Sequence, residues 1–525
     1  MTRWLHPLLL AAAPVLFLAA HNPHETTAQT VLVALAGSVA GAAALLGLAY
    51  AGTRNLARAG LVASACVVLF HAYGRGFDAL WDLEWDEERL FESSTVVHTI
   101  LFALEAVALA VVVLLVRRSK EEPELLPRLL TAFGALFAGM STFDIVQAGV
   151  EAPKVAAAAT ATEPRPEPLL SDDPAHPDVY FFILDGYARQ DVLKRFYTFD
   201  NAPFVDALRA RGFYVADQSR STYAETFLSL TSTLSMRYLD EFKSDTATEM
   251  EQRPAVYDLL HNHEVGRRFQ QQGYRYVHFN TNFSATERVD HADIAYSYRP
   301  PLLQSEFMSV FVRTTLLRPF EPDVASMYHY MFDTVETVPD IDGPTFTFLH
   351  LLAPHNPYVF DASGNVRSNV PLTLQMQEKT GGWKEKAQYV EQLQYLNTRY
   401  LQIIDSILAK SKVPPIIILQ SDHGSASSWD PKSKGKKRMR FWFERTGTLN
   451  AWYAPPSVQV RLTPKMLSVN TFRILLSELF GEDLPELEPH VYTSWYGAPY
   501  KFVDRVDTVD AAFDKAPPKV TTPTP

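Results

Sequence analysis

The sequence predicts an N-terminal all-α transmembrane bundle followed by an α/β domain with a mostly parallel central sheet and helices on both faces. Three observations lead to this prediction. Most of the continuous apolar runs of the 525-residue chain lie before residue 150. After residue 178, short apolar runs alternate with helical patterns, which is typical of a parallel or mixed α/β sheet. Between the two parts, residues 151–177 are rich in alanine and proline and predict an extended linker.

The composition excludes several kinds of protein. The net charge is -11, so the chain has no basic surplus of the kind that nucleic-acid binding needs. Its single cysteine, Cys66, lies inside an apolar run. The α/β domain therefore has no disulfide, no cysteine zinc site and no cysteine nucleophile. We expect a bilayer as partner and no nucleic acid.

Five apolar segments predict about five helices in a transmembrane domain over residues 1–150. The second and the fourth have roughly the 20 apolar residues that a bilayer core demands. The first is short and follows Arg3, so a cleaved signal peptide with four remaining spans is the alternative. The segments are residues 8–20, 31–51, 56–73, 96–116 and 129–150.

The flanking charges predict how this domain is oriented. Basic residues gather in alternate connections, whereas the connections over residues 22–30 and 76–92 are poor in them. This alternation is the positive-inside pattern of a cytoplasmic N-terminus, and five spans then place all residues after 150 outside the cytoplasm. We therefore expect a multi-pass protein of a bacterial inner (cytoplasmic) membrane. The basic residues are Arg3, Arg54, Arg58, Arg117, Arg118, Lys120 and Arg128.

The α/β domain is expected over residues 178–505, with a disordered Thr/Pro-rich tail over residues 506–525. Within the domain, apolar runs predict five strands and helical patterns predict four helices. The strands are expected at residues 180–184, 213–216, 274–279, 345–351 and 416–420, and the helices at 202–212, from 226, 383–409 and 469–480.

Two of these strands end on side chains that can bind a metal. Asp185 follows the first strand, and Asp422 and His423 follow the last. Because active sites of open α/β sheets lie at the carboxyl ends of the strands, we expect these side chains to meet. Carboxylate oxygen and imidazole nitrogen suit Mn, Zn or Mg. The alternatives are a helix-capping aspartate at 185 and a turn carboxylate beside a surface histidine at 422 and 423.

Two further segments carry candidate chemistry. Thr226 begins a predicted helix, where backbone N–H groups stabilise an anion, and a metal lowers the pKa of a hydroxyl enough to make it a nucleophile. A capped helix start is the simpler interpretation. His355 lies in a proline-bounded loop after a third strand, which suits contact with a phosphoryl oxygen or protonation of a leaving alkoxide. His350, within that strand, can equally be a core histidine.

Together, these motifs resemble the alkaline-phosphatase/sulfatase superfamily, and within it the membrane-anchored branch that includes lipoteichoic acid synthase and the lipid A phosphoethanolamine transferases. The resemblance implies a sulfatase-like extracytoplasmic domain after five spans and a linker. It also implies one divalent cation bound by Asp185, Thr226, Asp422 and His423, with Thr226 as nucleophile. His355-Asn356-Pro357 matches the family's phosphate-binding H-x-P loop, with His350 as a second substrate-binding member.

The departures from that family narrow the expected chemistry. The segment at Thr226 lacks the C/S-x-P-S/A-R context of formylglycine sulfatases, so sulfate-ester hydrolysis is not expected. No D-x-x-x-H pair lies between Thr226 and Asp422, which favours one metal over two. The residues after Gly424 lack the further histidine of phosphoethanolamine transferases, which argues against that substrate.

A run of six lysines and arginines over residues 432–440 follows the proposed metal motif. It is either a surface for anionic headgroups or a solvated mobile loop.

Together with the resemblance, the sequence predicts a metal-dependent transferase that moves a phosphoryl-linked headgroup from a lipid donor to a cell-envelope acceptor through a covalent Thr226 intermediate. A hydrolase with the same site, phosphodiesterase or phosphomonoesterase, is the first alternative. A catalytically inactive membrane-anchored sensor is the second.

Overall fold

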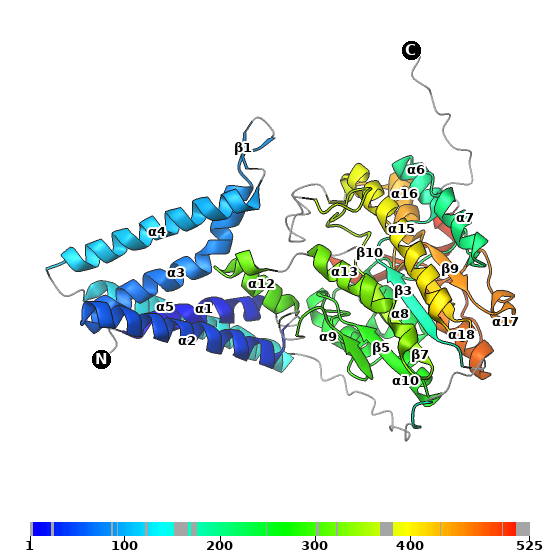
Figure 1. The fold of residues 1–525 in the computed structure, drawn as a ribbon, viewed down its shortest axis with the longest axis horizontal. Coiled ribbons are helices and arrows are strands. Elements are labelled where there is room, and N and C mark those ends of the chain that lie inside the picture. The colour runs from blue at the N-terminus through cyan, green and yellow to red at the C-terminus, as the bar shows by residue number, and fades with distance from the viewer. Residues whose placement is uncertain are drawn as a thin grey trace, which may run out of the picture. The chain divides into compact units, whose positions relative to one another are not determined.

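The structure is a computed structural model (Figure 1). It describes residues 4–510 except 23–25, 86–87, 92, 121–123, 152–165, 170–175, 248, 301–302, 304, 322–323, 368–381, 431 and 496. The chain forms two compact units. A helical unit contains Met1–Lys154, Asn282–Ser284 and Arg299–Asp323, and an α/β unit contains Val155–Thr281, Ala285–Tyr298 and Val324–Pro525.

Five helices of the helical unit lie over the five predicted apolar segments. Four of them are long and apolar enough to cross a membrane, and the first is shorter. The helices are α1 (His6–His21), α2 (Ala28–Thr53), α3 (Leu56–Trp81), α4 (Ser94–Arg118) and α5 (Leu125–Glu151), with a hairpin of β1 (Glu84–Trp85) and β2 (Glu88–Arg89) between α3 and α4.

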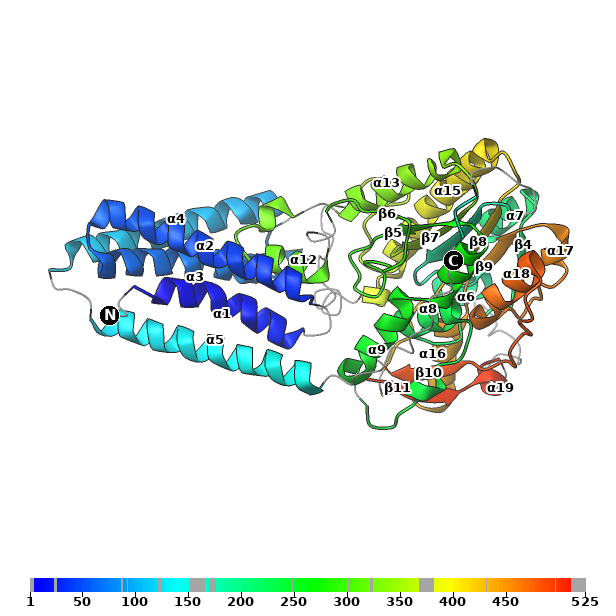
Figure 2. The same ribbon diagram turned by 90° about the horizontal axis from the view of Figure 1, so that it is seen from below.

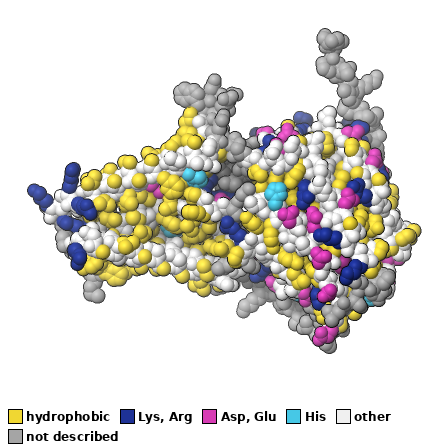
Figure 3. Space-filling view, in the orientation of Figure 1, with side chains coloured by type: hydrophobic (Ala, Val, Ile, Leu, Met, Phe, Trp, Pro, Cys, Tyr) yellow, Lys and Arg dark blue, Asp and Glu magenta, His cyan; other side chains and the backbone are white. Residues whose placement is uncertain are grey.

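Apolar side chains cover the outside of these helices. Val107 of α4 is 62% exposed and Leu48 of α2 is 72% exposed. Figure 3 shows hydrophobic side chains over the sides of the helical unit and basic side chains gathered at one end. Arg117 and Arg118 lie in the last turn of α4. Helices that are apolar on their outer faces fit a bilayer, and the orientation predicted from the charges stays a prediction.

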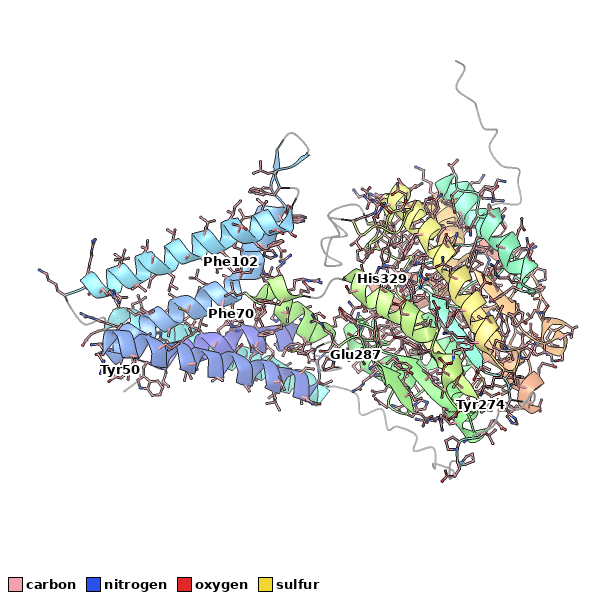
Figure 4. The ribbon with its side chains drawn as sticks, in the orientation of Figure 1. Tyr50, Phe70, Phe102, Tyr274, Glu287 and His329 are labelled. Carbon is pink, nitrogen blue, oxygen red and sulfur yellow. The ribbon has the colours of Figure 1, made fainter. Side chains whose placement is uncertain are left out.

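The helical unit also contains a segment from the middle of the sequence. Within residues 299–323, α12 (Glu306–Thr314) buries Phe307 and Phe311 in a cluster that includes Val15 of α1 and Phe70 of α3, which Figure 4 labels. The predicted α/β domain over residues 178–505 is therefore not continuous. The sequence pattern missed this because a short helix with one apolar face looks the same whichever unit it packs in.

Arg318 holds this segment against α3. It lies in the short helix η2 (Arg318–Phe320) and is 4% exposed. Its Nη1 donates hydrogen bonds to Asp78 Oδ1 at 2.7 Å and to Gly74 O at 3.0 Å, and the guanidinium lies 3.9 Å from the centre of the Phe77 ring. A guanidinium that is buried, paired and stacked in this way is costly to remove.

The α/β unit is built on a seven-stranded, mostly parallel sheet, as predicted. Its order is β4-β9-β8-β3-β7-β5-β6, with β9 antiparallel to both of its neighbours and the other pairs parallel. The strands are β3 (Val179–Leu184), β4 (Tyr214–Val215), β5 (Arg275–Phe279), β6 (Ile294–Tyr296), β7 (Thr345–Leu351), β8 (Ile416–Gln420) and β9 (Asn450–Tyr453).

Helices cover both faces of this sheet. Successive side chains of β3 point to opposite sides, and all of them are apolar, so both faces need cover. Tyr180 and Phe182 join the large core cluster with α13 (Val324–Val335) and α15 (Lys386–Lys410). On the other face, the Phe181 ring lies 4.8 Å from the Phe472 ring of α18 (Thr471–Phe480). Figure 2 shows α13 and α15 on one side of the sheet and α8 (Thr226–Ser235) and α9 (Glu249–His261) on the other.

The remaining elements connect this core. The helices are α6 (Gln190–Tyr197), α7 (Ala202–Ala210), α10 (Glu264–Gln271), α16 (Gly435–Thr446), α17 (Pro456–Gln459) and α19 (Val506–Val509). The 3-10 helices are η1 (Asp240–Phe242), η3 (Val338–Asp340), η4 (Gly382–Lys384) and η5 (Ser468–Asn470). A separate antiparallel hairpin pairs β10 (Tyr492–Trp495) with β11 (Ala498–Asp504).

Two segments that were expected to lack regular structure are partly helical. The tail predicted to be disordered over residues 506–525 begins with α19, because Val509 is buried in the main core and Asp510 pairs with Arg220. Residues 511–525 and most of the predicted linker lie outside the described residues. The basic run is also not a loop throughout, since residues from Gly435 onward form α16.

Candidate metal centre

The carboxyl ends of two adjacent parallel strands bring the first residues of the site together. Asp185 follows β3, and its backbone N donates to Leu351 O of β7 at 3.0 Å. The chain then turns at Gly186, whose φ of 70° favours glycine. Asp422 follows β8, and its Oδ1 accepts a hydrogen bond from Gly186 N at 3.2 Å. The two motifs are thus joined directly.

Thr226 is the first residue of α8 and reaches the same place. Its Oγ1 lies 3.0 Å from His423 Nε2. One turn further along α8, the Ser229 hydroxyl donates to Asp422 O at 2.6 Å and holds the helix against the motif after β8. Thr226 is half-buried, whereas Asp422 and His423 are buried.

The predicted ligands lie within a few ångströms of one another. His423 Nε2 is 3.6 Å from Asp185 Oδ1 and 3.3 Å from Asp422 Oδ2. Among the described residues, two groups could hold a metal ion with ligand atoms within 4.8 Å of one another: Asp185 with His355 and His423, and Asp185 with His350 and Asp422. Asp185 belongs to both groups, so it lies at the centre of the arrangement.

The chemistry of these residues fits a divalent cation. Asp185 Oδ1 and Asp422 Oδ2 are buried and accept no hydrogen bond within the described part of the chain. Burial raises the pKa of Asp185, and burial together with the neighbouring Asp185 charge raises the pKa of Asp422 to about 7. Two ionised carboxylates in such a place are unfavourable without a counter-charge, which a bound cation supplies.

Two histidines are held in the form that binds a metal or accepts a proton. His423 Nδ1 donates to Gly424 O at 2.9 Å, and His355 Nδ1 donates to Asn356 O at 2.7 Å. Burial lowers the pKa of both imidazoles. Because Nδ1 carries the proton in each neutral ring, Nε2 has the free lone pair.

His350 lies on the closed side of the site. It is fully buried on β7, with Nε2 3.3 Å from Asp185 Oδ2 and Nδ1 2.8 Å from Thr286 Oγ1. We expected His350 to bind substrate together with His355, but only His355 is half-exposed. The position of His350 behind Asp185 suits holding that carboxylate in place.

Three further residues at the site were missed by sequence reasoning. Glu225 precedes Thr226, and burial raises its pKa to about 7. The ring of Trp383, in η4, lies 4.8 Å from the ring of His355. A Cβ at Gly186 would collide with the Trp383 ring. Arg445 of α16 contacts the segments of both Thr226 and His423. No local pattern marks Trp383 or Arg445, because tertiary packing alone brings them to the site.

Gly424 is needed for close packing and not for a left-handed turn. Its φ is not positive. Instead, a Cβ at Gly424 would overlap the carbonyl oxygen of Glu444, and Gly424 N donates to Arg445 O at 2.6 Å. The glycine is required because the last turn of α16 packs directly on the metal motif.

Three solved structures match the chain at low sequence identity. The periplasmic domain of EptC from Escherichia coli in complex with Zn is 14% identical, covering 65% of this chain and 96% of that chain with a TM-score of 0.41. The periplasmic domain of phosphoethanolamine transferase EptC from Campylobacter jejuni is 12% identical, covering 60% and 92% with a TM-score of 0.39. The lipoteichoic acid synthase LtaP from Listeria monocytogenes is 10% identical, covering 65% and 89% with a TM-score of 0.38.

These identities and TM-scores are too low to transfer a function. Among curated proteins, no sequence matches the chain. The family model described as Sulfatase matches residues 177–446, which is slightly more than half of the chain and includes Asp185, Thr226, His355 and His423. This match confirms the superfamily that the motifs predicted, and the chain belongs to the sulfatase family.

Proposed function

We propose that this protein is a metal-dependent transferase that moves a phosphoryl-linked headgroup from a lipid donor to a cell-envelope acceptor through a covalent intermediate on Thr226. The observation that carries the proposal is the 3.0 Å approach of Thr226 Oγ1 to His423 Nε2, beside Asp185 and Asp422. An alcohol placed among metal-binding side chains at the N-terminus of a helix is suited to attack phosphorus.

The residues that would hold the cation are Asp185, Asp422 and His423, together with the Thr226 hydroxyl. A divalent ion bound there, Mn, Zn or Mg, lowers the pKa of the hydroxyl and neutralises charge on the phosphoryl oxygens. The protein contributes ligands that are already in place: Asp422 is fixed by Gly186 N, and the His423 ring is fixed by its bond to Gly424 O.

The chain's own residues then account for the two halves of the reaction. Thr226 Oγ1 forms a bond to phosphorus while the bond between phosphorus and the lipid alcohol breaks. His355 Nε2, the ring nitrogen left free by the bond between Nδ1 and Asn356 O, takes up the proton of the Thr226 hydroxyl through water and then gives it to the leaving oxygen. In the second half, the acceptor hydroxyl gives its proton to His355 and attacks phosphorus. The bond between phosphorus and Thr226 Oγ1 breaks, and His355 passes the proton to that oxygen.

The bilayer supplies the setting for such a donor. Four helices are long and apolar enough to cross a membrane, so a lipid substrate is available to the same chain. We propose that the α/β unit lies outside the cytoplasm of a bacterial inner membrane, on the basis of the alternating basic connections. In the proposed orientation, the last turn of α4, which contains Arg117 and Arg118, lies on the cytoplasmic side.

Mass spectrometry of the Thr226 peptide tests the proposal. Full-length protein in detergent is incubated with bacterial lipid extract and a divalent cation, and the wild type is compared with Thr226→Val. Thr233→Val, on the same helix with its hydroxyl bonded to Ser229 O, is the control. We expect an adduct on Thr226 in the wild type and the control and none in Thr226→Val.

The mass of the adduct names the transferred group, and the fate of that group separates transfer from hydrolysis. A labelled headgroup that ends on a glycan or polymer supports the transferase. The same label free in solution supports a phosphodiesterase or phosphomonoesterase instead. A wild-type protein that turns over substrate without any adduct on Thr226 contradicts both.

A further inference from the structure

The two carboxylate oxygens of Asp185 have different neighbours. Oδ1 lies 3.6 Å from His423 Nε2, and it accepts no hydrogen bond within the described part of the chain. Oδ2 lies 3.3 Å from Nε2 of His350, a side chain that is 0% exposed. One oxygen is therefore available to a cation beside His423, whereas the other faces a buried imidazole.

The contact with Asp185 defines which nitrogen of His350 carries the proton. An ionised carboxylate only accepts hydrogen bonds, so the contact is attractive when Nε2 is protonated. Burial disfavours the charged form of the ring, and in the neutral form Nδ1 then has the lone pair and accepts. Its neighbour is the hydroxyl of Thr286, with Oγ1 2.8 Å from Nδ1. Thr286 is therefore the donor in this hydrogen bond.

Thr286 is itself held in place from two sides. Its carbonyl oxygen accepts hydrogen bonds from Thr281 N at 3.2 Å and from His278 Nε2 at 3.2 Å. Its Oγ1 lies 2.9 Å from Thr281 Oγ1. Because the single hydroxyl proton of Thr286 goes to His350, the hydroxyl of Thr281 donates to Thr286. Thr281 and Thr286 are 0% and 1% exposed, so the hydroxyl chain is fully buried.

A metal ligand is the alternative role for His350. Together with Asp185 and Asp422 it forms a group that could hold an ion. A ligating Nε2 would need the proton on Nδ1, and Thr286 would then accept it. However, Thr226 Oγ1 lies 3.0 Å from His423 Nε2, so a cation bound by both lies beside the Oδ1 atom of Asp185. That arrangement leaves Oδ2 to His350.

We propose that Thr286 is a positioning residue for metal binding, whose hydroxyl keeps His350 Nε2–H on Asp185 Oδ2 and so directs Oδ1 toward the cation. This inference rests on the cation of the proposed function and adds a residue that touches neither metal nor substrate. The last torsion of an aspartate side chain is soft, so the two oxygens can change places. A contact to one of them fixes which oxygen faces the ion.

Titration of the metal-free protein with Mn²⁺ tests this role. Full-length protein in detergent is stripped with a chelator, and the Kd for Mn²⁺ is measured for the wild type, Thr286→Val and Thr286→Ser. Valine removes the hydroxyl, whereas serine keeps it. Because the outer partners of a ligand typically contribute about 10–100-fold to metal affinity, the Kd is expected to rise at least about tenfold in Thr286→Val. It is expected to stay close to the wild-type value in Thr286→Ser.

Thr345→Val is the matched control. Thr345 lies on β7, as His350 does, and it is 0% exposed. Its hydroxyl donates to Asp178 Oδ1 at 2.9 Å, at the opposite end of the strand and about 16 Å from His350. The substitution removes a buried hydrogen bond of similar length away from the metal centre. Thermal stability is expected to fall as in Thr286→Val, whereas the Kd for Mn²⁺ is expected to stay unchanged.

A double-mutant cycle separates positioning from general loss of structure. His350→Gln is expected to raise the Kd about 10–100-fold, and Thr286→Val is expected to add nothing in that background, because it acts through the ring. Additive effects of the two substitutions overturn the proposal. Complete loss of Mn²⁺ binding in His350→Gln also overturns it, since that result makes His350 a ligand.

The remaining outcomes separate this inference from the proposed function. A wild type that binds no Mn²⁺ contradicts both. A wild type and Thr286→Val that bind Mn²⁺ with equal Kd overturn the positioning role alone. Should Thr286→Val fail to fold, Thr281→Val replaces it. That variant removes the hydroxyl that orients Thr286, so the Kd is expected to rise, and an unchanged Kd overturns the proposal.

Discussion

The helical unit and the α/β unit place their apolar residues against different neighbours. Phe102 of α4, labelled in Figure 4, is 45% exposed, and Val107, five residues further along the helix, is 62% exposed. Every residue of β3, by contrast, is buried, from Val179 to Leu184. The first unit needs a lipid environment to cover its apolar surface, whereas the second covers its own. The closed core of the second unit encloses the acidic groups Asp185 and Asp422.

Replacement of one phenylalanine in each unit gives the largest expected difference. Phe181→Ala removes a ring that is 0% exposed between Phe348 and Phe472, and it is expected to lower the stability of the α/β unit by about 3–5 kcal/mol. Phe102→Ala is expected to cost less than about 1 kcal/mol. Thermal unfolding of the full-length protein in detergent measures both. Equal losses would mean that the two units are packed alike.

The buried carboxylates predict a pH effect in the metal-free protein. The pKa of Asp422 rises from 3.8 to about 7 in the folded state, so between these values the folded chain keeps a proton that the unfolded chain loses. The contribution of Asp422 to the free energy of unfolding is therefore greatest below pH 4 and falls as pH rises toward 7. From pH 5 to pH 7 the expected loss is about 2 kcal/mol, because each unit of pH contributes about 1.4 kcal/mol per proton and half of the proton is already released at pH 7.

Unfolding of chelator-treated full-length protein at several pH values measures this loss. Asp422→Asn is the control, since it removes one titrating group and should make the profile shallower, while Asp185 and Glu225 still titrate. Addition of a divalent cation should flatten it in the wild type, because the bound ion favours the ionised carboxylate. A metal-free protein that grows more stable from pH 5 to pH 7 contradicts the expectation.

Replacement of two separate glycines of the helical unit by alanine gives the smallest expected difference in stability. A Cβ at Gly74 of α3 would overlap the backbone of Arg313 and Thr314, whereas a Cβ at Gly47 of α2 meets nothing within 4 Å. Gly74→Ala is expected to destabilise the docked segment over residues 299–323 by about 1–3 kcal/mol, and Gly47→Ala is expected to have almost no cost. Limited proteolysis within that segment measures the difference. Identical cleavage in both variants would show that close packing at Gly74 does not hold the segment.

Continuous apolar runs account for what the sequence predicted well. The predicted bounds of β7 (Thr345–Leu351) and β8 (Ile416–Gln420) agree with the structure, because a central parallel strand is apolar on both faces and ends where polar residues begin. The same runs gave Asp185, Asp422 and His423 their positions at the carboxyl edge. Their convergence with Thr226 then follows from the order of the strands.

Residues that reach the site through packing had no such signal. Arg445 follows a basic run and looks like one more solvated cation, yet it is buried because the last turn of α16 packs on Gly424. The docked segment over residues 299–323 was missed for the same reason. Its apolar residues, among them Phe307 and Phe311, do not show which of the two units will cover them.

The metal content of the full-length protein tests the central claim most directly. Elemental analysis compares the wild type with Asp422→Asn and with Asp430→Asn, an exposed aspartate outside the site. The arrangement of Asp185, Thr226, Asp422 and His423 predicts about one divalent ion per chain in the wild type and in Asp430→Asn, and less than about a tenth of that in Asp422→Asn. Equal metal content in all three proteins would contradict a cation held at this site.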